Sequence, residues 1–339
     1  MKACQAVLLL LLALGCVHVG ESFKPNLPPL KDAQVLVIGA SGQVGEKVCL
    51  KLSQEGYRVR AMVRDVNNFF PRKKDLGEGP IEVVLGDVLD KRSLLAGMQD
   101  CQSCIDCHGA SRLAIPRDII VHPRNDPLKT HPYHVNYLGV KNIVEAAEEM
   151  GVKRLVRISG LSVGLPAFHP FTYLLNLLAS MAIKWQLEAE KVIREAQARG
   201  LEYTVVRPGS LTDKPRPQKA SLLLSSNGKP TSILKSWPMY TVSRKEVADL
   251  MVGALQSDNT VGSTISCSWG WRANGPKKWN KLLEKVKPDT GRLPSPFYKP
   301  AMAVWGVMTL VFISSTLLTI NKFTTTLTEG ARRAKYRRN

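Results

Sequence analysis

The chain has 339 residues, and its content of 44% hydrophobic and 22% charged residues excludes a mainly disordered protein. Its formal net charge of +19 favours an anionic partner, which is a nucleic acid, a membrane surface or an anionic ligand. The basic residues are spread along the chain and no zinc-finger or RNP motif is present. We therefore predict a membrane surface, and no nucleic acid, as the partner.

Residues 1–22 have the pattern of a targeting segment. One Lys precedes an uncharged stretch from Ala6 to Val17, which is too short to span a bilayer but matches the apolar core of a signal peptide. Small residues before Phe23 permit cleavage there. The short basic stretch that follows resembles the bipartite plastid leader of algae with secondary plastids. The segment is thus predicted to be a signal peptide or the first part of such a leader.

Strands and helices are expected to alternate from residue 33 onward. Apolar runs bounded by glycine and charged residues predict strands, and longer amphipathic segments predict helices. The expected strands are 34–40, 57–65, 81–90, 104–110, 153–160 and 201–209. The expected helices are 45–56, 93–100, 134–150 and 181–199. This order predicts an α/β fold with a doubly wound parallel sheet of the Rossmann type, in one domain over residues 33–285.

Three evenly spaced glycines stand between the first strand and the first helix, in "VLVIGASGQVGEKV". At such a junction the backbone N–H groups and the helix dipole favour phosphate. We expect Gly39 to permit the tight turn, Gly42 to let a pyrophosphate approach, and Gly45 to let helix and strand pack closely. The turn therefore predicts dinucleotide binding.

The end of the second strand bears on which dinucleotide is bound. An acidic residue here would hold the ribose 2′-hydroxyl of NAD, whereas a guanidinium suits the 2′-phosphate of NADP. The strand ends in Arg64 followed by Asp65. We predict NADP(H), held by Arg64, with NAD(H) as the alternative that Asp65 leaves open.

Taken in order, the glycine turn, "VRAMVRD", "GDVLD", "HVNYLGVKNIVEAAEEMGVKRLVRISG" and "LEYTVVRPGSLTD" resemble the atypical short-chain dehydrogenase/reductase superfamily, of the NmrA-like NAD(P)H-binding type. The resemblance implies that Asp87 and Val88 flank the adenine and that Asn136 braces the helix beneath the site. It also implies that Gly109 to Arg112 line the cofactor. The complete expected cofactor site is Gly39, Ser41, Gly42, Gln43, Val44, Gly45, Arg64, Asp87, Val88, Gly109, Ala110, Ser111, Lys184, Pro208, Gly209 and Leu211.

The superfamily's catalytic Tyr-x-x-x-Lys pair is incomplete. The resemblance places Lys184 at the lysine, which would hold the nicotinamide ribose, but Ser180 stands at the tyrosine. A serine hydroxyl is a poor general acid near neutral pH. Tyr173 is too far from Lys184 in the sequence to take the place of the tyrosine in this pair directly. The superfamily usually also has a serine after the fifth strand, and Ser159 and Ser162 are both candidates for that position.

Two other segments have open interpretations. Between Leu161 and Ile183 the only residue that can carry a charge near neutral pH is His169, and we weigh a buried interface helix against an apolar pocket wall or membrane-facing surface. Cysteines 101, 104 and 107 have spacing that occurs in metal sites. Their place on a strand would turn the thiols apart, so we predict buried cysteines and no metal site.

The C-terminal part predicts a membrane anchor. Residues 301–320 contain no charge and match the thickness of a bilayer, and residues 321–339 form a basic tail. We expect a single transmembrane helix at 301–320. A signal peptide with such a helix fits the endoplasmic reticulum, whereas a bipartite leader fits a plastid; we favour the plastid.

Two functions remain open from the sequence. One is a membrane-anchored NADPH-dependent oxidoreductase that acts on a hydrophobic small molecule. The other is a non-catalytic NADPH-binding factor that assists assembly or stability of a photosynthetic or respiratory membrane complex. The loss of the tyrosine favours the second. The first stays open because hydride transfer needs chiefly orientation and a proton source.

Overall fold

The structure, a computed structural model, describes residues 33–69, 77–115, 118, 123–166, 169–229, 241–270 and 275–290, together with residues 304, 307, 310, 311, 314 and 315. The expected targeting segment 1–22 and the basic tail 321–339 lie outside the described residues, as does most of 301–320. Within the described ranges, no helix has both the length and the apolar character needed to cross a bilayer. The structure therefore gives no support to the expected transmembrane helix.

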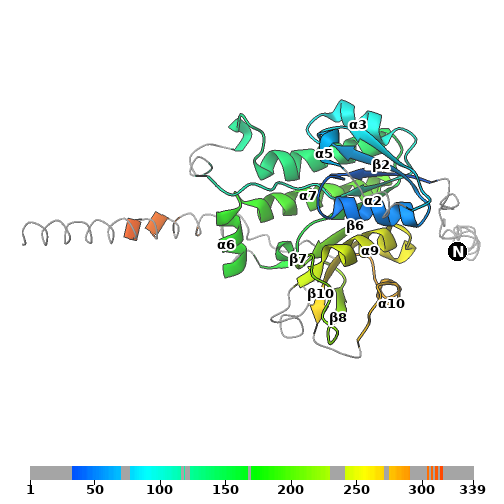
Figure 1. Cartoon of the computed structure of the whole chain (residues 1–339). Helices are drawn as coiled ribbons and strands as arrows, with labels where there is room; N and C mark the ends of the chain where they lie inside the picture. The colour runs from blue at the N-terminus through cyan, green and yellow to red at the C-terminus, as the bar shows by residue number, and fades with distance from the viewer. Residues whose placement is uncertain are drawn as a thin grey trace, which may run out of the picture.

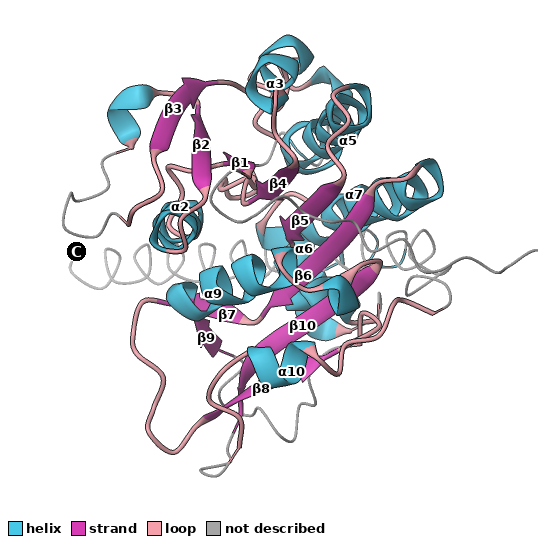
Figure 2. Ribbon diagram, turned by 90° about the vertical axis from the view of Figure 1, so that its right-hand side faces the viewer, coloured by secondary structure: helices cyan, strands magenta, loops and turns pink. Residues whose placement is uncertain are grey.

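One sheet of eight strands organises the fold (Figure 2). Its order is β3-β2-β1-β4-β5-β6-β10-β8, and every neighbouring pair is parallel except β10 with β8. Its strands are β1 (Gln34–Ile38), β2 (Arg58–Val63), β3 (Ile81–Leu85), β4 (Ser103–Asp106), β5 (Arg154–Ile158), β6 (Glu202–Pro208), β8 (Ser221–Ser225) and β10 (Ser263–Gly270). The order of the first six strands is that of a doubly wound sheet, which confirms the predicted Rossmann-type fold.

Helices cover both faces of the sheet (Figures 1 and 2). One face carries α2 (Gly45–Gln54) and α9 (Arg244–Leu255). The other carries α3 (Lys91–Met98), α5 (Gly139–Glu149) and α7 (Ala182–Ala196). The described residues also form the helices α6 (Pro170–Leu178) and α10 (Asn280–Leu283), several short 3₁₀ helices, and a separate parallel pair, β7 (Ser210–Thr212) with β9 (Thr241–Ser243).

The central strand β1 shows why both faces bury apolar surface. Successive side chains of a strand point to opposite faces. Val35 and Val37 therefore belong to the core beneath α2 and α9, whereas Leu36 and Ile38 belong to the core beneath α3, α5 and α7. A strand buried on both sides appears in the sequence as an unbroken apolar run, as "VLVI" does here.

The helix expected over 134–150 is divided into two parts. Tyr133–Leu138 forms a wider π-helical turn, and the regular helix α5 begins only at Gly139. Such turns interrupt α-helices mostly where a side chain has a particular task. Here Asn136 lies in the wide turn and its side chain accepts a hydrogen bond from the backbone N–H of Ala110, at 2.8 Å.

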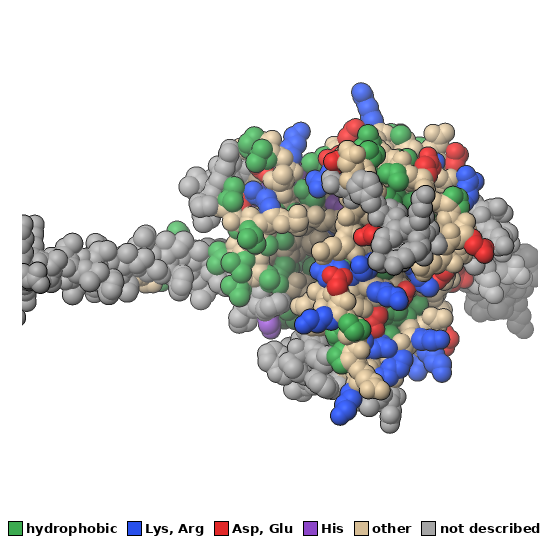
Figure 3. Space-filling model, viewed as in Figure 1, with side chains coloured by type: hydrophobic (Ala, Val, Ile, Leu, Met, Phe, Trp, Pro, Cys, Tyr) green, Lys and Arg blue, Asp and Glu red, His purple; other side chains and the backbone are tan. Residues whose placement is uncertain are grey.

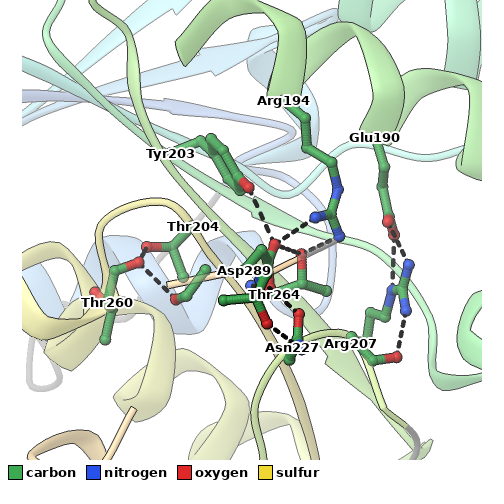
Figure 4. A network of polar contacts seen from close by, with 12 residues as sticks. Glu190, Arg194, Tyr203, Thr204, Arg207, Asn227, Thr260, Thr264 and Asp289 are labelled. Atoms are coloured by element: carbon green, nitrogen blue, oxygen red, sulfur yellow. Dashed lines mark hydrogen bonds and ion pairs between the residues drawn. The ribbon is translucent and has the colours of Figure 1, made fainter. Parts of the chain in front are cut away.

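A polar network joins the end of α7 to the sheet and to the segment after α10 (Figure 4). Arg194 donates to Asp289 at 2.5 Å and to the hydroxyl of Thr264 at 2.6 Å. Tyr203 on β6 donates to the same carboxylate at 3.0 Å. The chain as far as Asp289 is therefore tied into the Rossmann-type fold through α7, β6 and β10.

Candidate functional site

A pocket of about 810 Å³ opens at the carboxyl ends of β1, β2 and β4. In open α/β sheets this edge is where ligands bind. Nine of the residues expected to hold a cofactor line the pocket: Gly39, Ser41, Gly42, Arg64, Asp87, Val88, Gly109, Ala110 and Ser111. They come from four separate loops, so the fold brings together residues that are up to 72 positions apart in the chain.

The glycine turn has room for no side chain at two of its positions. Gly39 has a φ of +74°, and a Cβ there would lie 2.9 Å from the backbone nitrogen of His108. A Cβ on Gly45 would lie 2.1 Å from the carbonyl oxygen of Gly39. Gly42, between them in the turn, donates its N–H to the same oxygen at 3.0 Å and lines the pocket. The turn thus leaves backbone beside the start of α2, as phosphate binding requires.

Arg60 in β2 and Arg64, which directly follows β2, have different surroundings. Arg60 donates to Glu82 at 2.9 Å and to the carbonyl oxygens of Gly97 and Gln99 at 3.1 and 2.6 Å. Arg64 is exposed and lines the pocket. Of these two arginines, Arg64 is therefore the one placed to meet an anionic ligand in the pocket.

A buried ionic cluster supports the loop that follows β4. Asp106 at the end of β4 forms an ion pair with Arg157 of β5, and both side chains are fully buried. The carboxylate also lies 2.5 Å from Nδ1 of His108, whose Nε2 lies 2.9 Å from the carbonyl oxygen of Val135. Both ring nitrogens of His108 thus face acceptors. Because His108 lines the pocket, the cluster fixes one wall of it.

The residues predicted from the sequence do not include Asp106, His108 or Arg157. One signal was present in the sequence, because Asp106 and His108 are two residues apart at a strand end, which directs both to one face. That Arg157 lies directly opposite Asp106 on β5 is seen only in the structure. An isolated buried arginine needs such a partner.

Seven expected cofactor residues do not line the pocket. Gln43, Val44 and Gly45 lie in the turn and at the start of α2. Pro208, Gly209 and Leu211 lie at the junction of β6 and β7, and Lys184 lies on α7 with its ammonium 4.2 Å from the ring centre of Trp185. Their contacts with a cofactor stay predictions.

Ser180, at the position of the superfamily's tyrosine, is buried and engaged. Its hydroxyl donates to Oδ2 of Asp118 at 2.6 Å. Asp118 also forms an ion pair with Arg112 and accepts the N–H of Ile115 at 3.0 Å. Partial burial would raise the pKa of Asp118, but these hydrogen bonds and the charge of Arg112 lower it. Ser180 therefore joins the junction of α6 and α7 to the loop that lines the pocket.

Of the two serines considered after β5, Ser159 has a structural partner. Its hydroxyl donates to Glu190 at 2.7 Å. Glu190 forms a fully buried, two-pronged pair with Arg207, at 2.5 and 3.0 Å (Figure 4). Removing either partner of such a buried pair would leave an uncompensated charge. Ser159 is thus part of the contact between β5, β6 and α7.

Two of the three spaced cysteines are buried as expected, and the third is half-buried. Cys104 is fully buried in β4, Cys101 is buried just before it, and Cys107 is half-buried at the pocket. Burial raises the pKa of Cys101 to about 11. Among the described residues, no group of three or more His, Cys, Asp or Glu side chains could hold a metal ion.

A model of an NAD(P)H-binding family matches residues 39–258, from the first glycine of the turn to the end of α9 and the turn that follows. The chain belongs to this NAD(P)H-binding family. The resemblance to atypical short-chain dehydrogenases/reductases is thereby confirmed, and the family is one that binds a nicotinamide cofactor.

Two relatives resemble the chain at low identity. Protein TIC 62, chloroplastic, of Arabidopsis thaliana is 27% identical over 292 residues, which are 81% of this chain and 39% of TIC 62. Sanguinarine reductase of Eschscholzia californica is 25% identical over 253 residues, which are 67% of this chain and 85% of the reductase. The chain thus spans less than half the length of TIC 62.

Solved structures resemble the fold. The oxidoreductase ylbE from Lactococcus lactis superposes with a TM-score of 0.51 at 18% sequence identity. The superposition covers 74% of this chain and 95% of ylbE. At this identity the likeness establishes the Rossmann-type fold alone.

Proposed function

We propose that this protein is an NADPH-dependent oxidoreductase that is anchored to a membrane and acts on a hydrophobic small molecule. The observation that carries the proposal is that the glycine turn and Arg64 line the same pocket at the carboxyl edge of the sheet. Membership of the NAD(P)H-binding family supplies the cofactor class. A reductase among the relatives supports the reaction class.

The preference for NADPH rests on Arg64 and Asp65. Among the described residues no ion pair engages Arg64, and its exposed guanidinium could form charge-assisted hydrogen bonds with a 2′-phosphate. Asp65 instead accepts the N–H of Asn67 at 2.9 Å and does not line the pocket. An acidic side chain that accepts this backbone hydrogen bond and lies outside the pocket lining is poorly placed to hold a ribose 2′-hydroxyl.

Bound NADPH would supply a hydride, and the protein would orient the nicotinamide and provide for a proton. In this proposal Lys184 holds the nicotinamide ribose, as the resemblance implies. Ser180 does not serve as the acid, since its hydroxyl already donates to Asp118. The proton then comes from solvent or from the substrate's surroundings.

The second candidate is a non-catalytic NADPH-binding factor that assists a membrane protein complex. It is favoured by the same Ser180, because a residue that forms a structural hydrogen bond has replaced the expected proton donor. In this candidate the cofactor stabilises the fold, and the complex, rather than a small molecule, is the partner.

The place of action is proposed from the sequence and the relatives. Residues 301–320 are uncharged and would anchor the protein as a single-pass membrane protein. TIC 62 is described as chloroplastic, and the leader resembles a bipartite plastid signal, so we propose a plastid membrane.

Both candidates are tested with the purified full-length protein. Calorimetry measures NADPH binding, and loss of NADPH absorbance measures turnover with a quinone, an isoprenoid and a tetrapyrrole as acceptors. The matched control is Gly42→Asp, whose carboxylate would occupy the place of the pyrophosphate. Binding with turnover supports the oxidoreductase, and binding without turnover supports the assembly factor. Failure to bind NADPH would remove both.

A further inference from the structure

Helix α6 has its polar side inward and its apolar side outward. Thr172 and Asn176 are four residues apart, share one face, and are 0% and 2% exposed. Leu174, Leu177 and Leu178 occupy the other face and are 47%, 38% and 51% exposed. A helix on the surface of a water-soluble domain has the opposite arrangement, with leucines toward the core.

Asn176 explains why this orientation is fixed. The helix α7 follows Met181, which has a φ of +61° and provides no side-chain cap. The side-chain oxygen of Asn176 accepts the N–H groups of Ile183 and Lys184 at 3.1 and 3.3 Å instead. Rotating α6 to bury its leucines would remove this cap, which is worth about 1 kcal/mol in typical helices.

The apolar surface continues onto the loop that lines the pocket. Leu113 and Ile115 are 76% and 42% exposed. Between them, Ala114 donates its N–H to the carbonyl oxygen of Leu178 at 2.9 Å, so this loop lies against the end of α6. We call the five exposed residues the apolar patch: Leu113, Ile115, Leu174, Leu177 and Leu178. Figure 3 shows hydrophobic side chains gathered at the end of the molecule that α6 forms.

We propose that the apolar patch inserts into the lipid of one membrane leaflet. Its members are aliphatic, and between Leu161 and Ile183 the chain has no charged residue that insertion would have to desolvate, apart from His169 when protonated. The net charge of +19 complements anionic lipid headgroups. A protein interface, by comparison, is enriched in aromatic and arginine side chains at its centre.

A second apolar segment lies on the same side. The described residues of the 301–320 stretch lie beyond the α6 end of the folded part (Figure 1). Four of them are exposed hydrophobic residues: Val304, Val307, Leu310 and Val311. If this stretch enters a bilayer, the patch on α6 faces the same surface.

The patch also bears on the substrate, a step that rests on the proposed function. Arg112 lines the pocket and Leu113 begins the patch, so the pocket and the patch share an edge. An apolar substrate dissolved in the bilayer would reach the pocket from the lipid without crossing water. The substrate class that fits is a membrane-dissolved lipophile.

The test places a tryptophan in the patch. Full-length Leu177→Trp is reconstituted into vesicles of phosphatidylcholine and phosphatidylglycerol, with or without bromine on the acyl chains. The six native tryptophans are present in every protein, so the quantity measured is the emission added over wild type. The matched control is Leu85→Trp, because Leu85 is 63% exposed on edge strand β3, outside the patch.

We expect bromine to remove most of the emission added at position 177 and little of that added at position 85. Emission at position 177 that bromine leaves intact would overturn the proposal and assign the patch to a protein or to a second copy of the chain. Leu174→Trp serves as the second probe if Leu177→Trp does not bind NADPH. NADPH titration of the wild type tests the proposed function separately, since quenching requires neither cofactor nor turnover.

Discussion

Asp106 and Arg157 lie opposite one another on β4 and β5, and neither side chain is exposed to solvent. Burial alone would raise the pKa of Asp106, but the charge of Arg157 and the hydrogen bond with His108 outweigh it and lower the pKa to about 2. The carboxylate is therefore held ionised directly beneath the loop that lines the pocket.

Removing this carboxylate should destabilise the protein strongly. Asp106→Asn leaves Arg157 buried without its ion pair, and breaking a buried pair costs about 3–5 kcal/mol. Urea unfolding measures the loss. The matched control is Glu82→Gln, because the pair of Glu82 with Arg60 has a carboxylate that is 56% exposed and should contribute no more than about 1 kcal/mol. Similar losses in both variants would contradict this assignment.

The same pair predicts a pH dependence. A carboxyl whose pKa is lower in the folded than in the unfolded protein stabilises the fold above its unfolded value, about 3.9 for Asp. This contribution is lost as the pH falls from about 4 toward the folded value of about 2. The free energy of unfolding of wild type should thus fall more steeply in this window than that of Asp106→Asn. Parallel curves would show that Asp106 does not carry the dependence.

The parts of the fold that the sequence predicted are those with short-range signals. The run "VLVI" followed by three glycines specified β1, the turn and α2 within 21 residues. The regular alternation of apolar strands and amphipathic helices predicted the first six strands and a doubly wound sheet, which the observed strand order bears out. Arg64 was found because it directly follows β2, whose end is part of the pocket edge.

The parts that were missed depend on long-range contacts. The strand β10 has the sequence "STISCSWG". Its serines and threonine interrupt any apolar run, although the strand is buried throughout between β6 and β8. The bond between Ser180 and Asp118 joins residues 62 positions apart. The leucines of α6 are visible in the sequence, but the sequence does not show that they face outward. That direction depends on the cap that Asn176 provides to α7.

Cofactor choice should depend on Arg64. Losing a charge-assisted pair with the 2′-phosphate costs about 1.5–3 kcal/mol, so Arg64→Ala should weaken NADPH binding roughly ten- to a hundredfold and leave NADH little changed. Arg60→Ala in the preceding strand β2 is the matched control, since Arg60 is bound to Glu82 and to two carbonyl oxygens. Calorimetry with both cofactors measures the ratio. Equal weakening of NADPH and NADH by Arg64→Ala would refute the role of this arginine.

The glycine turn should tolerate no methyl group at Gly45. A Cβ there would lie 2.1 Å from the carbonyl oxygen of Gly39, which belongs to the backbone and cannot move aside. Gly45→Ala should therefore abolish NADPH binding or unfold the turn. At Gly160 the nearest atom to a Cβ is the hydroxyl of Ser162 at 3.7 Å, an ordinary contact, so Gly160→Ala should bind NADPH normally. Normal binding by Gly45→Ala would show that the turn is built differently.

The C-terminal segment should provide the firm attachment to the membrane. Deleting residues 299–339 removes the uncharged stretch and the basic tail. The shortened protein should be released by a carbonate wash, because the apolar patch alone would hold it only as a peripheral protein. Its NADPH affinity, measured in parallel, should match that of the full chain. Retention in the washed pellet would place the firm anchor elsewhere in the chain.

Catalysis, if present, should depend on Lys184 and not on Ser180. Lys184→Ala should lower turnover by roughly a hundredfold, because a misplaced nicotinamide loses its orientation toward the substrate. NADPH binding should weaken far less, since the glycine turn and Arg64 keep their contacts. Ser180→Ala removes the hydrogen bond to Asp118 and should cost about 1 kcal/mol of stability without a comparable loss of turnover. Steady-state kinetics and calorimetry on both variants separate these effects. A hundredfold loss of turnover in Ser180→Ala would mean that the serine hydroxyl takes part in the reaction after all.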